Sequence, residues 1–297
     1  MPRPLPDPST MPTGASRIYN RCVSAALALV APLMLGIIAL HVLWGALAAG
    51  LLFPLLPARK RDALVRFWSQ IALVALGIRL ELHHHPGAAP IAATRGSLLL
   101  INHTSWADVF VVAAVTPARF VAKSDIERWP LLGRFAASVG TVFIERGRRH
   151  AVAHVNHAVR ARLQAGQSVG IFPEGTTTDG SVLLRFHSNM VQAALEAQAP
   201  VVPLGVRYVQ DGRPTAAAAF IGEMTLAGSM WRILVTPRLT AQLYWLPAIV
   251  CAGQTRQAIA GHARDAIAAA LGFEQERAAP PEVAFEVPLE SPTGGRG

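Results

Sequence analysis

The chain has 297 residues, of which 52% are hydrophobic and only 15% charged, and its mean hydropathy is +0.36. Soluble domains carry about 25% charged residues, so this composition favours a membrane-associated protein with one substantial core. The 27 lysines and arginines outnumber the 18 acidic residues, which suits an anionic membrane face or simply keeps an apolar protein soluble. Without a recognition module or a basic stripe with interleaved aromatics, we expect no nucleic-acid partner.

The first apolar stretch predicts a helix seated in a membrane. Residues 1–21 are rich in Pro, Ser and Thr at their start and are expected to be a disordered lead-in. Residues 22–56 are almost uncharged and exceed the ~20 residues of one straight span, and Pro32 or Pro54 could break them. Basic residues flank both sides, so a shallow hairpin with both ends on the cytoplasmic side and a tilted span both stay open.

The second stretch, residues 63–80, predicts the partner helix of this pair. Leu64, Phe67 and Ile71 form an apolar face that arginines interrupt, and Trp68 is a natural anchor at headgroup level. Residues 22–80 are therefore expected to form a membrane-associated helical pair. Only two cysteines are present, far apart and without metal-type spacing, which fits a reducing compartment. We expect a membrane protein whose active site faces the cytoplasm.

From residue 81 to about 275, short apolar runs alternate with helical segments. Strands are predicted at 97–101, 119–122, 141–144, 168–172 and 201–206, and helices at 106–115, 129–138, 148–165, 188–198 and 255–272. This alternation predicts an α/β domain with a mixed, largely parallel sheet flanked by helices. Residues 276–297, with their Pro, Glu and Gly content, are expected to be a disordered tail.

The motif NHTSWAD, residues 102–108, directly follows the first of these strands. On one continuous helix His103 and Asp108 would lie about 140° apart, but a turn from strand to helix can bring them together. An aspartate bound to Nδ1 of a histidine fixes the tautomer and leaves Nε2 as a base toward a hydroxyl. Ser105 and Asp108 also fit a helix capping box, so a purely structural role stays open.

A second loop, residues 172–180 (FPEGTTTDG), also follows a predicted strand. Its single acid, its glycines and its three adjacent threonines make a tight loop rich in donors, which suits a polar headgroup or a phosphate. Taken alone, the same residues also fit an ordinary turn between a strand and a helix.

In their order, these motifs resemble the four sequence blocks of the glycerolipid acyltransferase family. The matches are His103 and Asp108 for His-x4-Asp, Gly140, Phe143, Ile144 and Arg146 for the second block, 172–176 for Phe-Pro-Glu-Gly-Thr, and 202–204 for Val-Pro-hydrophobic. The resemblance covers about residues 95–210, with the apolar helical pair in the expected place before it. It implies an enzyme of phospholipid biosynthesis.

The resemblance implies transfer of a fatty acyl chain from acyl-CoA or acyl-carrier protein to the free hydroxyl of a lysolipid at a membrane. His103, oriented by Asp108, would remove the proton of the acceptor hydroxyl, with no acyl-enzyme, no metal and no cofactor. The commonest activity in the family makes 1-acyl-glycerol-3-phosphate the expected acceptor. Another lysolipid, such as a lyso-ornithine lipid or a lysophospholipid, is the alternative.

The resemblance also implies residues that bind the acceptor. Arg146 would hold a phosphate by a bidentate contact, and Glu174 with Gly175 would shape the acceptor site, beside Thr176 and Thr177. The family commonly has arginine where this chain has Thr177. One cationic contact with the headgroup is therefore missing.

Three other interpretations fit the sequence less well. Residues 166–170 match the G-x-S-x-G elbow of esterases, but the strand follows Ser168 instead of preceding it. The adjacent His83, His84 and His85 cannot readily share one metal ion because neighbouring side chains on a strand point to opposite faces. A lipid-binding protein that retains the fold without catalysis is the non-enzymatic alternative, and the presence of both His103 and Asp108 argues against it.

Overall fold

The computed structural model describes residues 13–127, 132–144 and 149–273. Within them, one mixed sheet has the strand order β1-β8-β6-β2-β5-β3-β4, with β7 paired to β6. The strands are β1 Arg79–His84, β2 Leu98–Ile101, β3 Ala118–Lys123, β4 Val142–Ile144, β5 Ser168–Ile171, β6 Val201–Gln210, β7 Arg213–Pro214 and β8 Leu239–Trp245. All neighbours are parallel except β6 with β7 and with β8. The prediction of a mixed, largely parallel sheet is confirmed.

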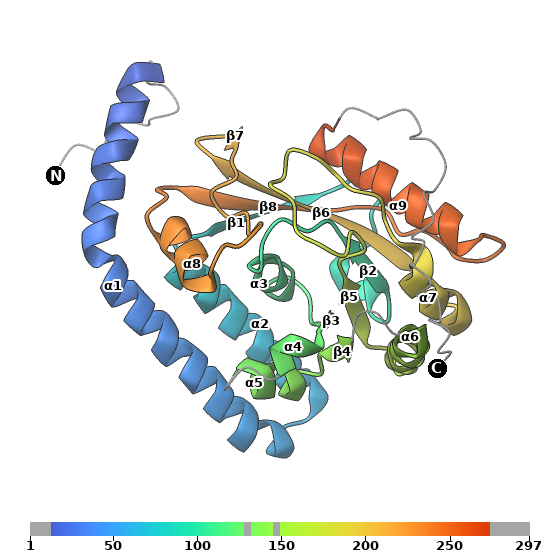
Figure 1. Cartoon of the computed structure of the whole chain (residues 1–297). Coiled ribbons are helices and arrows are strands. Elements are labelled where there is room, and N and C mark those ends of the chain that lie inside the picture. Colours follow the sequence, from blue (N-terminus) through green and yellow to red (C-terminus); the bar gives the residue numbers. More distant parts are fainter. Residues whose placement is uncertain (1–12, 128–131, 145–148, 274–297) are drawn as a thin grey trace, which may run out of the picture.

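Helices cover both faces of the sheet (Figure 1). Alternate residues of β2 point to opposite faces, so Leu99 and Ile101 pack with α3 (Asp108–Ala113), α2 (Ala58–Ala75) and α8 (Leu226–Leu234). Leu98 and Leu100 pack with the helices of the other face, which are α6 Arg149–Gln164, α7 Val191–Ala197 and α9 Arg256–Leu271. β2 is buried along its whole length because it lies between these two cores. The short helices α4 (Ser124–Glu127) and α5 (Leu132–Ser138) follow β3.

The first apolar stretch forms one continuous helix, α1, from Thr13 to Leu51. Its described part starts at Thr13, within the expected lead-in, and the helix continues through Pro32 without a break. Residues 1–12, like the expected tail from 276, lie outside the described residues. Pro54, in the 3₁₀ turn Phe53–Leu55, instead marks the corner where the chain turns toward α2. The hairpin is therefore made by α1 and α2 together, and not within the first stretch.

α1 lies along the flank of the domain (Figure 1). Residues near both of its ends contact the rest of the chain. Near its start, the Asn20 amide donates to Asp211 Oδ2 over 2.8 Å, and Arg238 Nε donates to Asp211 Oδ1 over 2.7 Å. Near its end, Ala49 packs in a small cluster with Phe53 and Val65. Residues 19–51 are long and apolar enough to cross a membrane, yet only 6% of their most apolar window is buried within the protein.

α2 buries Trp68, which the sequence placed at headgroup level. Trp68 is 4% exposed, stacks on the His41 ring at 4.6 Å and donates its indole N–H to the His41 carbonyl. The expectation of Trp68 as a headgroup anchor is therefore wrong. Phe67 and Ile71, two residues of the predicted apolar face, lie at the surface. α2 buries its Trp68 side because α1 and α3 pack there.

Candidate active site

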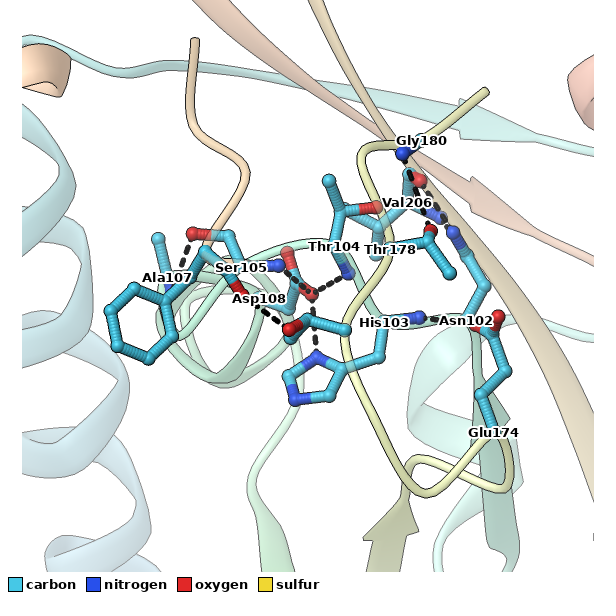
Figure 2. A network of polar contacts seen from close by, with 12 residues as sticks. Asn102, His103, Thr104, Ser105, Ala107, Asp108, Glu174, Thr178, Gly180 and Val206 are labelled. Atoms are coloured by element: carbon cyan, nitrogen blue, oxygen red, sulfur yellow. Dashed lines mark hydrogen bonds and ion pairs between the residues drawn. The ribbon is translucent and has the colours of Figure 1, made fainter. Parts of the chain in front are cut away.

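The site is built on the turn that joins β2 to α3. β2 ends at Ile101, and the Asn102 side chain joins this turn to β6: its Nδ2 donates to the Val206 carbonyl over 2.9 Å, and its Oδ1 accepts the Val206 N–H over 2.7 Å. Asn102 thereby continues the pairing of β2 with β6 for one residue past the strand. The turn that carries His103 is fixed to the sheet before α3 begins at Asp108 (Figure 2).

The Asp108 carboxylate is fully buried, and both of its oxygens accept hydrogen bonds. Oδ2 accepts the backbone N–H groups of Thr104 and Ser105 over 2.8 and 2.9 Å and contacts His103 Nδ1 at 2.9 Å. Oδ1 accepts the Tyr208 O–H over 2.7 Å. Burial, and then the Asp108 charge, raise the pKa of Tyr208 well above its usual value, so the phenol keeps its proton and remains a donor.

These contacts define the tautomer of His103. Both oxygens of Asp108 accept from donors that keep their protons, and this arrangement assigns to Nδ1 of His103 the role of a further donor to Oδ2. Nε2 of a neutral imidazole then carries the lone pair. The His103 side chain is 20% exposed, and its second ring nitrogen points away from Asp108 in Figure 2. The ring stacks on Phe172 at 3.9 Å, which holds its plane.

The second predicted loop lies directly against this turn. Glu174 Oε1 accepts the backbone N–H of His103 over 2.7 Å, and Oε2 accepts that of Leu184 over 2.9 Å. The Thr178 N–H donates back to the His103 carbonyl over 2.9 Å. Burial raises the pKa of the Glu174 carboxyl, against the lowering effect of the two N–H bonds. Glu174 therefore holds the two loops together, and both of its oxygens are used within the protein.

The other predicted acceptor residues fall on the same loop or outside the described part. Gly175 and Thr176 are exposed, and Gly175 has φ +72°, a conformation that favours glycine. The Thr177 hydroxyl donates to the Phe220 carbonyl, while the Phe220 N–H donates to Thr104. Thr177 thus ties the site to a further loop. Arg146 lies outside the described residues.

Several contacts of the site were missed in the sequence. Tyr208 is one hundred positions from Asp108 along the chain, and the only signal for it was an aromatic hydroxyl inside the apolar strand VVPLGVRYV. Phe172 was part of a predicted motif, but its stacking on the His103 ring was not predicted.

Ser168, the serine of the esterase-like motif, is buried in β5 and donates to the Thr94 carbonyl. Among the described residues, no group of three His, Cys, Asp or Glu side chains is arranged to hold a metal ion.

A carboxylate-oriented histidine at the carboxyl ends of parallel strands, with its free nitrogen at the surface, is typical of enzymes that transfer a group to a hydroxyl. Comparison with known proteins gives the family. An acyltransferase family model matches residues 84–207. The 1-acyl-sn-glycerol-3-phosphate acyltransferase of Neisseria gonorrhoeae is 37% identical over 186 residues, which is 62% of this chain and 71% of that protein.

A second relative, the lyso-ornithine lipid O-acyltransferase of Pseudomonas aeruginosa, is 35% identical over 215 residues, 72% of this chain and 80% of that protein. The crystal structure of the 1-acyl-sn-glycerophosphate acyltransferase of Thermotoga maritima has the same fold, with a TM-score of 0.58 at 17% identity over 89% of this chain and 99% of that one. This chain belongs to the glycerolipid acyltransferase family. The resemblance drawn from the four sequence blocks and the assignment as an acyltransferase are confirmed.

Proposed function

We propose that this enzyme acylates the free hydroxyl of 1-acyl-glycerol-3-phosphate at a membrane surface, with a fatty acyl thioester as donor. The observation that carries the mechanism is the 2.9 Å contact between His103 Nδ1 and a carboxylate that three further donors fix. His103 Nε2 is then a base of fixed orientation toward a hydroxyl that approaches from solvent. General base catalysis of this kind contributes about 10²–10⁴-fold.

The transfer needs only the acceptor hydroxyl, the acyl thioester and His103. His103 Nε2 takes the proton of the acceptor hydroxyl as its oxygen attacks the thioester carbonyl, and a tetrahedral intermediate forms. When the intermediate collapses, the carbon–sulfur bond breaks and the thiolate leaves with the proton of the His103 imidazolium. Asp108 stabilises the imidazolium between these steps. CoA and acyl-carrier protein both supply a thioester of this kind.

The acceptor headgroup is the second element of the proposal. A phosphate monoester needs cationic contacts, each worth about 1.5–3 kcal/mol. The Thr177 hydroxyl is bonded to Phe220, so the loop offers no cation at this position. Arg185 follows Leu184, whose N–H binds Glu174, and its side chain is exposed. We propose that Arg146 and Arg185 hold the phosphate.

A lyso-ornithine lipid is the second candidate, favoured by two observations. The Pseudomonas aeruginosa relative with that name matches a larger share of this chain than the Neisseria gonorrhoeae relative does. Thr177 supplies a neutral hydroxyl where the family commonly supplies a charge, which suits a zwitterionic amino-acid headgroup better than a phosphate.

The test compares acceptors in wild type, Arg185→Ala and Thr177→Arg. The purified enzyme receives lysophosphatidate or lyso-ornithine lipid with acyl-CoA or acyl-carrier protein, and the acylated lipid is measured. We expect lysophosphatidate to be preferred and Arg185→Ala to raise its KM about tenfold or more. If wild type acylates only the lyso-ornithine lipid, the proposed acceptor is wrong. If no lysolipid is acylated from either donor, the proposed function itself is wrong.

The membrane seating of α1 and α2 is also proposed. It is supported by the exposed leucines of α1 and by the contacts of both ends of this helix with one domain. A helix whose two ends are held by the same domain is suited to lying in the interface rather than to crossing the bilayer. On this proposal the active site faces the cytoplasm, the side on which acyl thioesters are made.

A further inference from the structure

A pocket of about 450 Å³ lies beside α2 and away from His103. It lies between α2, the 3₁₀ turn Ile91–Thr94 and the segment Val115–Pro117. β2 runs from Leu98, near this pocket, to Ile101, before His103, and α3 runs from Asp108 toward Val115. The pocket and the catalytic turn are therefore at opposite ends of the same strand and helix.

Positive charge is in excess around this pocket. Asp62 is the one carboxylate among its lining residues, and it serves two guanidinium groups: Arg119 donates to Oδ1 over 2.6 Å and Arg95 to Oδ2 over 3.3 Å. Arg59 and Arg66 also line the pocket, and within the described part of the chain neither has an ion pair. Two exposed guanidinium groups are thus left to bind an anion.

The arginines lie beside an apolar stripe on α2. Arg59 and Arg66 are seven residues apart, which places them within about 20° of each other around the helix and about 10 Å apart along it. Phe67, Ile71 and Val74 follow on the adjacent side of the helix and are exposed. Helices with a cationic band next to an apolar band lie at the boundary between headgroups and acyl chains.

The walls of the pocket are mostly hydrocarbon. Ile91, Val115 and Pro117 contribute side chains that offer no hydrogen bond to a small, fully hydrated anion. A free phosphate would have its hydration replaced only on the side of the guanidinium groups and not on the side of these apolar walls. An anion attached to acyl chains satisfies both surfaces, since its charge meets the guanidinium groups and its chains meet the apolar stripe.

We propose that this pocket binds the phosphodiester headgroup of an anionic glycerophospholipid of the surrounding membrane, with Arg59 and Arg66 as the phosphate contacts. The proposal rests on the membrane seating proposed above. The bound lipid is not the acyl acceptor, because the pocket lies at the far ends of β2 and α3 from His103. It fixes the depth and tilt of α2, and so the height of the catalytic turn above the membrane.

The test is native mass spectrometry of the full-length protein released from detergent. Three probes are added separately: phosphatidylglycerol, phosphatidylcholine and inorganic phosphate. The variant is Arg59→Ala with Arg66→Ala. The control is Arg213→Ala with Arg256→Ala, which removes the same charge from β7 and from α9. We expect wild type and control to retain one phosphatidylglycerol, and the pocket variant to bind it at least tenfold more weakly, at roughly fivefold for each arginine.

Each other result overturns the proposal. Equal weakening in the control would mean diffuse attraction of an anion to a basic protein. Equal retention of phosphatidylcholine would remove the selection for charge, and binding of inorganic phosphate as tight as that of phosphatidylglycerol would make this a free-phosphate site. Acylation of a micellar lysolipid, measured on the same samples, separates the two proposals. Transfer without selective lipid binding rejects only the pocket, and lipid binding without transfer rejects only the proposed function.

Discussion

Charged side chains are ordinarily exposed and large apolar ones buried, and Asp108 and Leu29 are exceptions of opposite kinds. Asp108 is a charged side chain with 0% exposure, while Leu29 is an apolar side chain with 84% exposure. A buried carboxylate is stable only when donors replace its water, and Asp108 has four of them within the protein. No described residue shields the Leu29 side chain from solvent to a comparable degree. The catalytic turn thus finds all its partners within the protein, while the exposed apolar side of α1 supports the membrane seating proposed above.

The largest effect on stability is expected from Asp108→Ala. The change leaves two buried backbone N–H groups and the Tyr208 O–H without their acceptor, at about 1–3 kcal/mol each. The free energy of unfolding in detergent should fall by at least about 3 kcal/mol, as measured by urea titration.

His103→Ala is the matched control for this change. It removes one donor from Asp108 and leaves the other three, and His103 is partly exposed, so stability should fall by less than about 1 kcal/mol. Equal losses in the two variants would show that the Asp108 network does not stabilise the turn.

The next effect concerns the exposed side of α1. Leu29, Leu33 and Leu40 lie on one side of this helix and are exposed, so glutamine at all three positions should not disturb the fold. Partition into vesicles should fall about a hundredfold, because roughly 3 kcal/mol of apolar burial is lost. Flotation with liposomes measures it. Polar substitution of Leu82, Val182 and Val250, also exposed, is the control and should leave partition unchanged. The seating assigned to α1 is wrong if both triple variants float equally.

Tyr208→Phe should have a moderate effect. It removes the hydrogen bond to Asp108 Oδ1 while the contact of Oδ2 with His103 remains. We expect unfolding to become easier by about 1.5–3 kcal/mol and kcat to fall by roughly tenfold, with KM unchanged, because the base is less rigidly oriented. An effect confined to KM would place Tyr208 in substrate binding instead.

The smallest effect is the pH dependence that Glu174 adds. Burial raises the pKa of this carboxyl in the folded state, so the group contributes stability below its ordinary pKa, and this is lost as pH rises through the raised value. Glu174→Gln is neutral throughout and lacks this contribution. Urea titrations between about pH 4 and 8 should show wild type losing stability relative to Glu174→Gln as pH rises. A gap between them that widens in the opposite direction would contradict the raised pKa.

The catalytic turn could be predicted because its residues are close in sequence. His103 and Asp108 meet across five positions, and Asp108 orients His103 while it also accepts the Ser105 N–H. The capping box itself does not form, because Ala107 is the N-cap of α3 and no side chain caps the helix. Glu174 was found through its motif, although its bond to the His103 N–H was not. Tyr208 could not be assigned, since no local rule joins two residues one hundred positions apart.

The buried face of α2 could not be predicted for a different reason. The sequence placed Trp68 at headgroup level, yet the helix buries it, because the neighbours that cover it come from α1 and α3. The same packing limits where the chain can be truncated for a test of membrane binding. A protein that starts at Glu81 would lose Leu73, Leu76 and Ile78 from the main core, so removing both helices would test folding and not membrane binding.

The central claim is that His103 is the base of acyl transfer to a lysolipid hydroxyl. The most direct measurement follows radiolabelled acyl chains from acyl-CoA into a lysolipid, catalysed by wild type and by His103→Ala at equal folded concentration. The account predicts that kcat/KM falls by about 10²–10⁴-fold in the variant, while the unfolding midpoint in urea stays close to that of wild type. Turnover within a few fold of wild type in a folded His103→Ala protein would contradict it.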